Sequence, residues 1–122
     1  MNLYQLGEME QRFAELIWAN APVASGELVR LCAEAFDWKK STTYTMLHRL
    51  CDRGIFVNDG GTVSVVLTRE AWLSLQSEAF VEETFSGSLP RCLSAFASRK
   101  ALNEDEVAAL EQMIAAYRKK GD

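Results

Sequence analysis

The sequence has few of the residues from which metal sites and disulfide frameworks are built. Its 122 residues include one histidine and three cysteines. An odd number of cysteines at wide spacing argues against a disulfide framework, and a single histidine does not make a zinc site. We therefore expect no metal and no other cofactor. The sequence also lacks a Gly-rich phosphate loop and the spacing of a catalytic triad, so it does not favour an enzyme.

Long apolar runs are absent as well. No stretch approaches the roughly 20 apolar residues that a membrane span needs. The N-terminus has neither the basic start nor the apolar block of a signal peptide. We expect a cytoplasmic protein without membrane insertion. Hydrophobic residues make up 48% of the chain and charged residues 25%, which is typical of a globular protein rather than a disordered one.

A net charge of −4 speaks against nucleic acid as a partner, but the charge is unevenly distributed. Residues 38–54 contain four cations (Lys39, Lys40, Arg49 and Arg53) and one carboxylate, a net of +3 that leaves −7 for the rest of the chain. A basic patch on an acidic protein can still bind DNA, because affinity depends on local neutralisation of phosphates.

The stretch 41–54 carries the strongest functional pattern. At helical period one side is apolar, and the opposite side is rich in hydroxyls and basic at its far end. Gly54 suits the left-handed position that commonly ends a helix. Hydroxyl, Tyr, His and Arg side chains on one exposed face reach base edges and phosphates. The candidate DNA-contacting residues are Lys39, Lys40, Ser41, Thr42, Tyr44, Thr45, His48 and Arg49.

Taken alone, this stretch also fits an amphipathic surface helix with a solvated polar face, but its neighbours favour DNA binding. Residues 55–57 and 62–67 read as two β segments around the turn signal 58–61. Before them, helices are expected over 7–20 and from Ser25, as N-cap, to about Phe36. This order predicts a winged helix-turn-helix. The expected inward residues of the first two helices are Met9, Phe13, Leu16, Ile17, Leu28, Leu31, Cys32, Ala35 and Phe36.

Residues 70–122 predict a second, helical domain after a winged-helix domain of residues 1–69. A helix is expected over 70–85, a break at Gly87, and a last helix that begins at Asn103 with Glu106 completing a capping box. These helices carry more large apolar side chains than so short a region can bury. We expect a dimerisation region, in a fold that is mainly α with a small β hairpin. The alternative is a monomer whose helices fold back over the winged helix.

Several stretches also carry a resemblance to a known family. They are residues 18–23, residues 42–50 with Arg53 and Gly54, residues 85–88 and residues 102–106. With them the chain resembles the penicillinase-repressor family, also called BlaI/MecI. The resemblance implies an N-terminal winged helix, a C-terminal dimerisation region and repression by blocking a promoter. It places the family's DNA contacts on Ser41, Thr42, Tyr44, Thr45 and Arg49.

The chain departs from the family pattern at two places. Family wings usually carry Lys or Arg, whereas residues 57–62 have neither and include Asp59. β-Lactam-responsive members are cut by a membrane sensor protease at an Asn–Phe bond, and the matching positions here are Ala95 and Phe96. The Phe is kept and the Asn is not. The copper-responsive branch is less similar, because its Cys-x-Cys tail is absent.

The sequence thus predicts a homodimeric transcriptional repressor that binds a palindromic DNA operator through the helix around 41–53. The regulated promoter is expected to serve resistance or stress response. The alternative is a winged helix used for protein–protein contact, which the acidic body and the uncharged wing favour. The basic patch of Lys39, Lys40 and Arg49 favours DNA, because the centre of a protein-binding face is usually apolar or aromatic.

Overall fold

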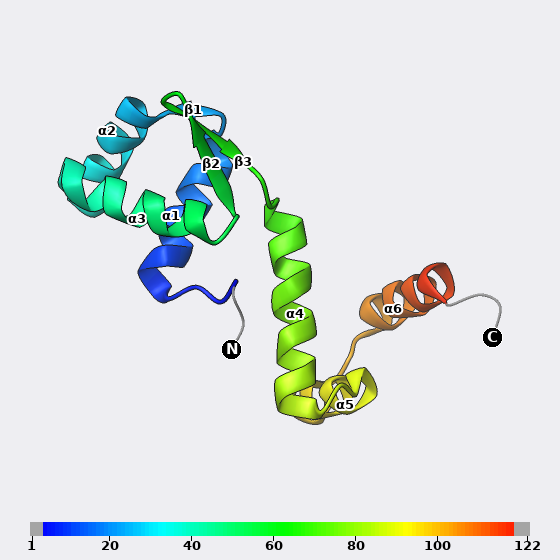
Figure 1. Ribbon diagram of the computed structural model, residues 1–122. Coiled ribbons are helices and arrows are strands. Elements are labelled where there is room, and N and C mark those ends of the chain that lie inside the picture. The colour runs from blue at the N-terminus through cyan, green and yellow to red at the C-terminus, as the bar shows by residue number, and fades with distance from the viewer. Residues whose placement is uncertain (1–3, 119–122) are drawn as a thin grey trace. The chain divides into compact units, whose positions relative to one another are not determined.

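The computed structural model describes residues 4–118, in which the chain forms six helices and a three-stranded antiparallel sheet (Figure 1). The expected fold class, mainly α with a small β element in a winged helix, is confirmed. The elements in chain order are α1 (Glu8–Asn20), β1 (Val23–Ala24), α2 (Ser25–Phe36), α3 (Lys40–Asp52), β2 (Phe56–Asp59), β3 (Thr62–Val65), α4 (Arg69–Phe85), α5 (Leu89–Arg99) and α6 (Glu104–Tyr117).

The chain divides into two compact units, the first ending at Phe80 and the second beginning at Val81. This division falls inside α4, eleven residues after the expected domain boundary at residue 69. The first part of α4 therefore belongs to the same compact unit as the winged helix. The assignment of separate functions to residues 1–69 and 70–122 stays a prediction.

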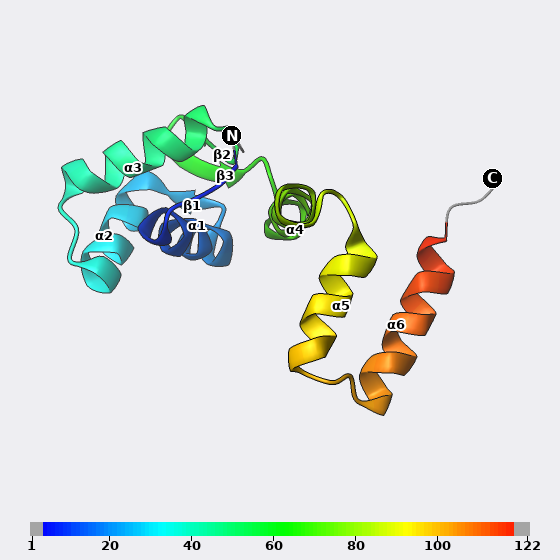
Figure 2. The ribbon, with the colours of Figure 1, turned by 90° about the horizontal axis from the view of Figure 1, so that it is seen from below.

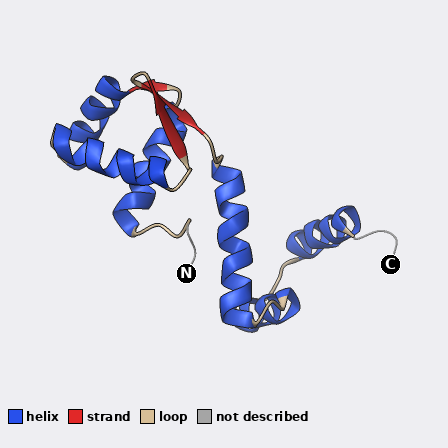
Figure 3. Cartoon of the chain, in the orientation of Figure 1, coloured by secondary structure: helices blue, strands red, loops and turns tan. Residues whose placement is uncertain are grey.

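In the first unit, α1, α2 and α3 pack with a sheet of order β1-β3-β2 (Figure 3). β1 was not expected, because residues 21–24 read only as a break between two helices. Its two residues pair with β3, Val23 opposite Val63 and Ala24 opposite Thr62. A strand this short has no alternation to recognise in the sequence, so only its tertiary pairing defines it.

The wing turn is tighter than expected. Asn58 and Asp59 lie within β2, so the turn consists of Gly60 and Gly61 alone rather than of residues 58–61. Both glycines have positive φ, 61° and 93°. This is the requirement of the two-residue turns whose twist matches a hairpin. The Asn58 side chain accepts a hydrogen bond from the Gly61 N–H at 3.1 Å and so fastens the turn.

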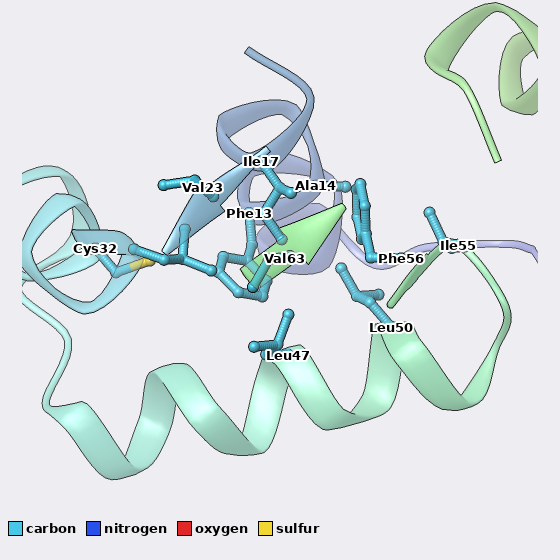
Figure 4. Packing of buried hydrophobic residues seen from close by; sticks show 11 residues of the cluster. Phe13, Ala14, Ile17, Val23, Cys32, Leu47, Leu50, Ile55, Phe56 and Val63 are labelled. Atoms are coloured by element: carbon cyan, nitrogen blue, oxygen red, sulfur yellow. The ribbon is translucent and has the colours of Figure 1, made fainter. Parts of the chain in front are cut away.

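The core of the first unit lies between α1, α2, α3 and the sheet (Figure 4). Two residues expected to point inward are exposed, namely Met9 and Ala35. In the first turn of α1 the inward position is Glu10 instead, whose carboxylate pairs with Arg53. Apolar periodicity could not indicate a charged residue there. The buried core residues are Phe13, Ala14, Ile17, Val23, Leu28, Cys32, Leu47, Leu50, Ile55, Phe56 and Val63.

In the second unit α5 and α6 face one another (Figure 2). The expected start of α6 is confirmed: Asn103 Oδ1 accepts from the Glu106 N–H at 2.8 Å, and Glu106 Oε1 accepts from the Asn103 N–H at 3.1 Å. Ser86 and Gly87, both at positive φ, end α4 at the expected break. Among residues 4–118, no helix is long and apolar enough to cross a membrane.

Candidate nucleic-acid interface

Helix α3 is held by its inner side and by its entry turn. Leu47 and Leu50 are buried, and Thr43 is buried with its hydroxyl donating to the Lys39 carbonyl at 3.3 Å. Just before the helix, the Trp38 ring lies 4.9 Å from the ring of Phe36 and 5.3 Å from that of Phe13. These contacts fix the direction in which the opposite side of α3 faces.

The outward side of α3 gathers most of the residues predicted to contact DNA. They are exposed to solvent and lie on the helix or its entry turn. The exposed members are Lys39, Lys40, Ser41, Thr42, Thr45, His48 and Arg49. Tyr44 is the exception, because its side chain is half-buried. The helix therefore presents exposed hydroxyls, an imidazole and Arg49, and its entry turn adds the exposed cations Lys39 and Lys40.

Tyr44 is held by Ser25, a residue that sequence reasoning assigned a different role. We expected Ser25 to be the N-cap of α2, but the N-cap is Ala24 and Ser25 is the first helical residue. Its hydroxyl accepts a hydrogen bond from the Tyr44 hydroxyl at 3.1 Å, and its N–H donates to the Gly61 carbonyl at 2.8 Å. Ser25 thus joins the start of α2, the wing turn and α3. No pattern in the sequence signals this contact.

The cations of the basic patch are not equivalent. Arg49 stays exposed, with Nη1 3.7 Å from the sulfur of Met46 one turn earlier. Arg53 faces elsewhere: it donates to the Gln5 carbonyl at 3.0 Å and pairs with Glu10 at 3.4 Å. The sequence count of four cations therefore overstates the patch. Arg53 is committed to a partner within the first unit.

His48 and Asp52 form an exposed pair on α3, with Nε2 and Oδ2 3.3 Å apart. Both side chains are more than two-thirds exposed, so solvent screens the pair and it contributes little to stability. Its position matters more than its strength. The pair lies beside Arg49 at the C-terminal end of the outward side, where Asp52 brings a negative charge to an otherwise basic surface.

Cys32 is buried in the first unit, and Cys51 is half-buried. Burial raises the pKa of the Cys32 thiol, although a hydrogen bond with Thr43 opposes this, and burial likewise raises the pKa of Cys51. Both cysteines therefore stay protonated near neutral pH and act as small packing residues. Within the described part of the chain, no cluster of His, Cys, Asp and Glu could hold a metal ion.

The second unit carries a cleft of about 370 Å³ between α5 and α6. Phe96, the second residue of the predicted cleavage position, lines this cleft and is 52% exposed. Ala95 precedes it in the middle of α5, exposed and outside the cleft lining. The lining is apolar throughout and consists of Leu89, Cys92, Leu93, Phe96, Leu110, Met113 and Ile114.

Comparison with known families gives one result that covers both units. A family model described as penicillinase repressor matches residues 6–116, nearly the whole chain. The resemblance found in the sequence is therefore confirmed. Among curated proteins, no sequence matches the chain.

Proposed function

Since the chain belongs to the penicillinase repressor family of winged-helix transcriptional repressors, we propose that it represses as a homodimer bound to a palindromic operator. The observation that carries this proposal is the outward side of α3. There, the exposed hydroxyls lie on the same helix as the exposed Arg49, and Lys39 and Lys40 are exposed at its entry. The major groove of DNA admits a helix of this kind. The regulated promoter is proposed to be one for resistance or stress response.

The outward residues divide by chemistry into two roles. Arg49 is proposed to reach a guanine edge with two hydrogen bonds, a contact that specifies sequence. The hydroxyls of Ser41, Thr42 and Thr45 can bond to bases or to phosphates. Lys39 and Lys40 at the entry of α3 suit phosphates, which fix register but carry no sequence information. His48 is proposed as a phosphate or water contact.

The proposed dimer rests on the apolar surface of α5 and α6. Leu89 and Ile114 are 61% and 62% exposed, and Phe96 is 52% exposed, although all three line one cleft. An apolar surface of this kind usually marks an interaction site. A second copy would cover it by two-fold symmetry and would bring two α3 helices to a two-fold operator. We expect the shared surface to exceed about 2,000 Å².

The wing favours the alternative of a protein-binding module. It carries Asp59 and no cation, so any contact of the wing with phosphate must come from backbone N–H groups or hydroxyls. Selection from random DNA distinguishes the two functions. A repressor selects a defined sequence from a pool of random DNA duplexes, whereas a protein-binding module selects none.

The test of the proposed function uses such a selected duplex and the variant Arg49→Ala. If Arg49 reads a guanine, its loss weakens binding by roughly 1–3 kcal/mol at both low and high salt. If it contacts a phosphate, the salt dependence becomes shallower instead. The matched control is Arg30→Ala, since Arg30 is also exposed but pairs with Glu27 and Glu34 on α2. Unchanged binding by Arg49→Ala at both salt concentrations would remove Arg49 from the interface.

Regulation by a membrane sensor protease is proposed to be impaired at Ala95-Phe96. Ala95 and Phe96 lie within α5, so cutting requires local opening of that helix. The Phe remains as a recognition group, but a methyl group replaces the expected Asn side chain. We expect slow or absent cutting by a β-lactam-type sensor protease and faster cutting of Ala95→Asn, measured by fragment mass. Equal cutting of both proteins would show that the Asn is dispensable.

A further inference from the structure

The N-terminal strap, defined here as residues 4–7, is tied to α4 at one end. The Tyr4 carbonyl accepts two hydrogen bonds from α4, from Trp72 Nε1 at 2.8 Å and from Gln76 Nε2 at 3.0 Å. Trp72 is buried, and Gln76 is half-buried one turn later. One backbone oxygen therefore fixes the strap to two successive turns of α4.

The other end of the strap is tied to the end of α3. Arg53, the C-cap of α3, donates to the Gln5 carbonyl at 3.0 Å. It also pairs with Glu10, whose Oε1 accepts the Gly7 N–H at 2.9 Å. The side chains of Arg53 and Glu10 are 30% and 15% exposed. Charge-assisted hydrogen bonds with this little exposure are stronger than surface ion pairs.

The start of α4 is held independently on another side. Trp18 Nε1 donates to the Leu67 carbonyl at 3.0 Å, and the Trp18 ring lies 5.6 Å from the ring of Trp72. The direction of α4 within the first unit is thus set by the aromatic contacts and by the strap. The strap also links α4 to α3, because Arg53, the C-cap of α3, donates a hydrogen bond to the strap residue Gln5.

We infer that Arg53 is a positioning residue. It restricts how far apart the two half-sites of the operator can lie for the dimer to bind both. This inference rests on the proposed function, a dimer on a palindrome. Arg53 faces the strap rather than the outward side of α3, so it acts through the direction of α4, the helix that leads into the second unit. Each base pair added between half-sites rotates one relative to the other by about 34°. Because the first half of α4 is held against the first unit through Trp72 and Gln76, its direction within that unit cannot follow that rotation.

The experiment compares Arg53→Gln and Gln76→Leu with the wild-type protein. These variants act on opposite ends of the same strap. Arg53→Gln removes the arginine at the α3 end, and Gln76→Leu removes one of the two hydrogen bonds at the α4 end while the Trp72 bond and the Arg53–Glu10 pair stay in place. Arg30→Gln is the control, because it removes an arginine from ion pairs outside the strap. The probes are a palindrome selected by the wild-type protein from random duplexes of about 40 bp, the same palindrome with one base pair added or removed at its centre, and a single half-site.

We expect the wild-type protein and Arg30→Gln to lose about tenfold or more in affinity when the spacing changes, since linked binding contributes a factor of 10²–10⁴ that depends on geometry. Arg53→Gln should lose less than about threefold, and Gln76→Leu should lose less than the wild-type protein but more than Arg53→Gln, both with unchanged affinity for the single half-site. Full retention of the spacing preference in both variants would overturn the inference. So would an equal loss on the single half-site, because Arg53 would then act on α3 alone. A wild-type protein that selects no palindrome would instead refute the proposed function, and this inference with it.

Discussion

The two units of this chain differ in how they bury apolar side chains. In the first unit, three helices and a small sheet enclose a core of fully buried residues that includes Phe13, Leu50 and Phe56. In the second unit, no residue from 81 to 118 is buried, although α5 and α6 carry large apolar side chains. The first unit encloses its apolar side chains, whereas the second unit leaves those of α5 and α6 partly or fully exposed.

This difference separates two tasks that sequence patterns alone do not distinguish. Amphipathic helices occur in both units, and each has one apolar side. Only the structure shows that the apolar sides of α1, α2 and α3 meet one another, whereas those of α5 and α6 leave an open cleft. The proposed dimer would supply the missing half, as in obligate interfaces that resemble a divided domain core.

The largest expected effect comes from breaking the second unit's apolar surface with a charge. Ile114→Glu should convert a dimer to a monomer in sedimentation and weaken operator binding by a factor of 10²–10⁴, because linkage of the two half-sites is lost. Tryptophan emission should not change, since all three tryptophans, Trp18, Trp38 and Trp72, lie in the first unit. Gln112→Glu is the control: it adds the same charge on α6 outside the cleft lining. Dimerisation of Ile114→Glu would contradict the proposed interface.

A second comparison removes the same apolar volume from each unit. Leu50→Ala should destabilise the first unit by about 2–5 kcal/mol, because Leu50 is fully buried and its loss leaves a cavity. Leu93→Ala, in α5 of the second unit, should leave the stability of the first unit nearly unchanged. Urea unfolding followed by tryptophan emission measures the first unit in both variants. A large shift of the midpoint by Leu93→Ala would mean that the units do not unfold separately.

Thiol labelling of the wild-type protein compares a buried cysteine of the first unit with a cysteine in the cleft of the second unit. Burial raises the pKa of Cys32 in the first unit, so we expect it to react at least about tenfold more slowly than an accessible thiol near neutral pH. Cys92, half-buried in the cleft lining, should react faster than Cys32 in dilute protein and slow down as concentration rises. Mass spectrometry of alkylated peptides gives both rates. A Cys92 rate independent of concentration would argue against a partner over the cleft.

The smallest expected effect concerns the turn that ends α3. Gly54 has φ of 77°, and an added Cβ would meet no atom within 4 Å. Gly54→Ala should therefore cost about 1 kcal/mol through backbone strain alone. The loss should appear as a lower urea midpoint of tryptophan emission. A variant as stable as the wild type would show that this turn can relax into another conformation.

The sequence predicted the elements that local chemistry specifies. Helix α3 and its closing glycine followed from apolar period and from the conformational freedom of Gly54, and both are confirmed. The start of α6 followed from Asn103 and Glu106, whose reciprocal hydrogen bonds need only three residues of separation. Such features are visible in sequence because their partners are neighbours.

The features that sequence reasoning missed have distant partners. β1 exists because Val23 pairs with Val63, and Ser25 matters because it meets Tyr44 and Gly61. Arg53 was counted with the basic patch, yet it lies against Glu10, which is 43 residues away in sequence. Charge and periodicity cannot indicate which way such a side chain turns. The outward position of the α3 residues agrees with the expectation, and their contact with DNA stays a prediction.

The withdrawal of Arg53 from the outward side of α3 has a consequence for how the protein would search a chromosome. Fewer phosphates are neutralised, so fewer counterions are released when the protein meets DNA of arbitrary sequence. The net charge of −4 adds a general repulsion from the duplex. Encounters with the wrong sequence should be brief, and sliding along it short. A small number of molecules would then suffice to keep one operator occupied, because little of the population is sequestered on the rest of the genome.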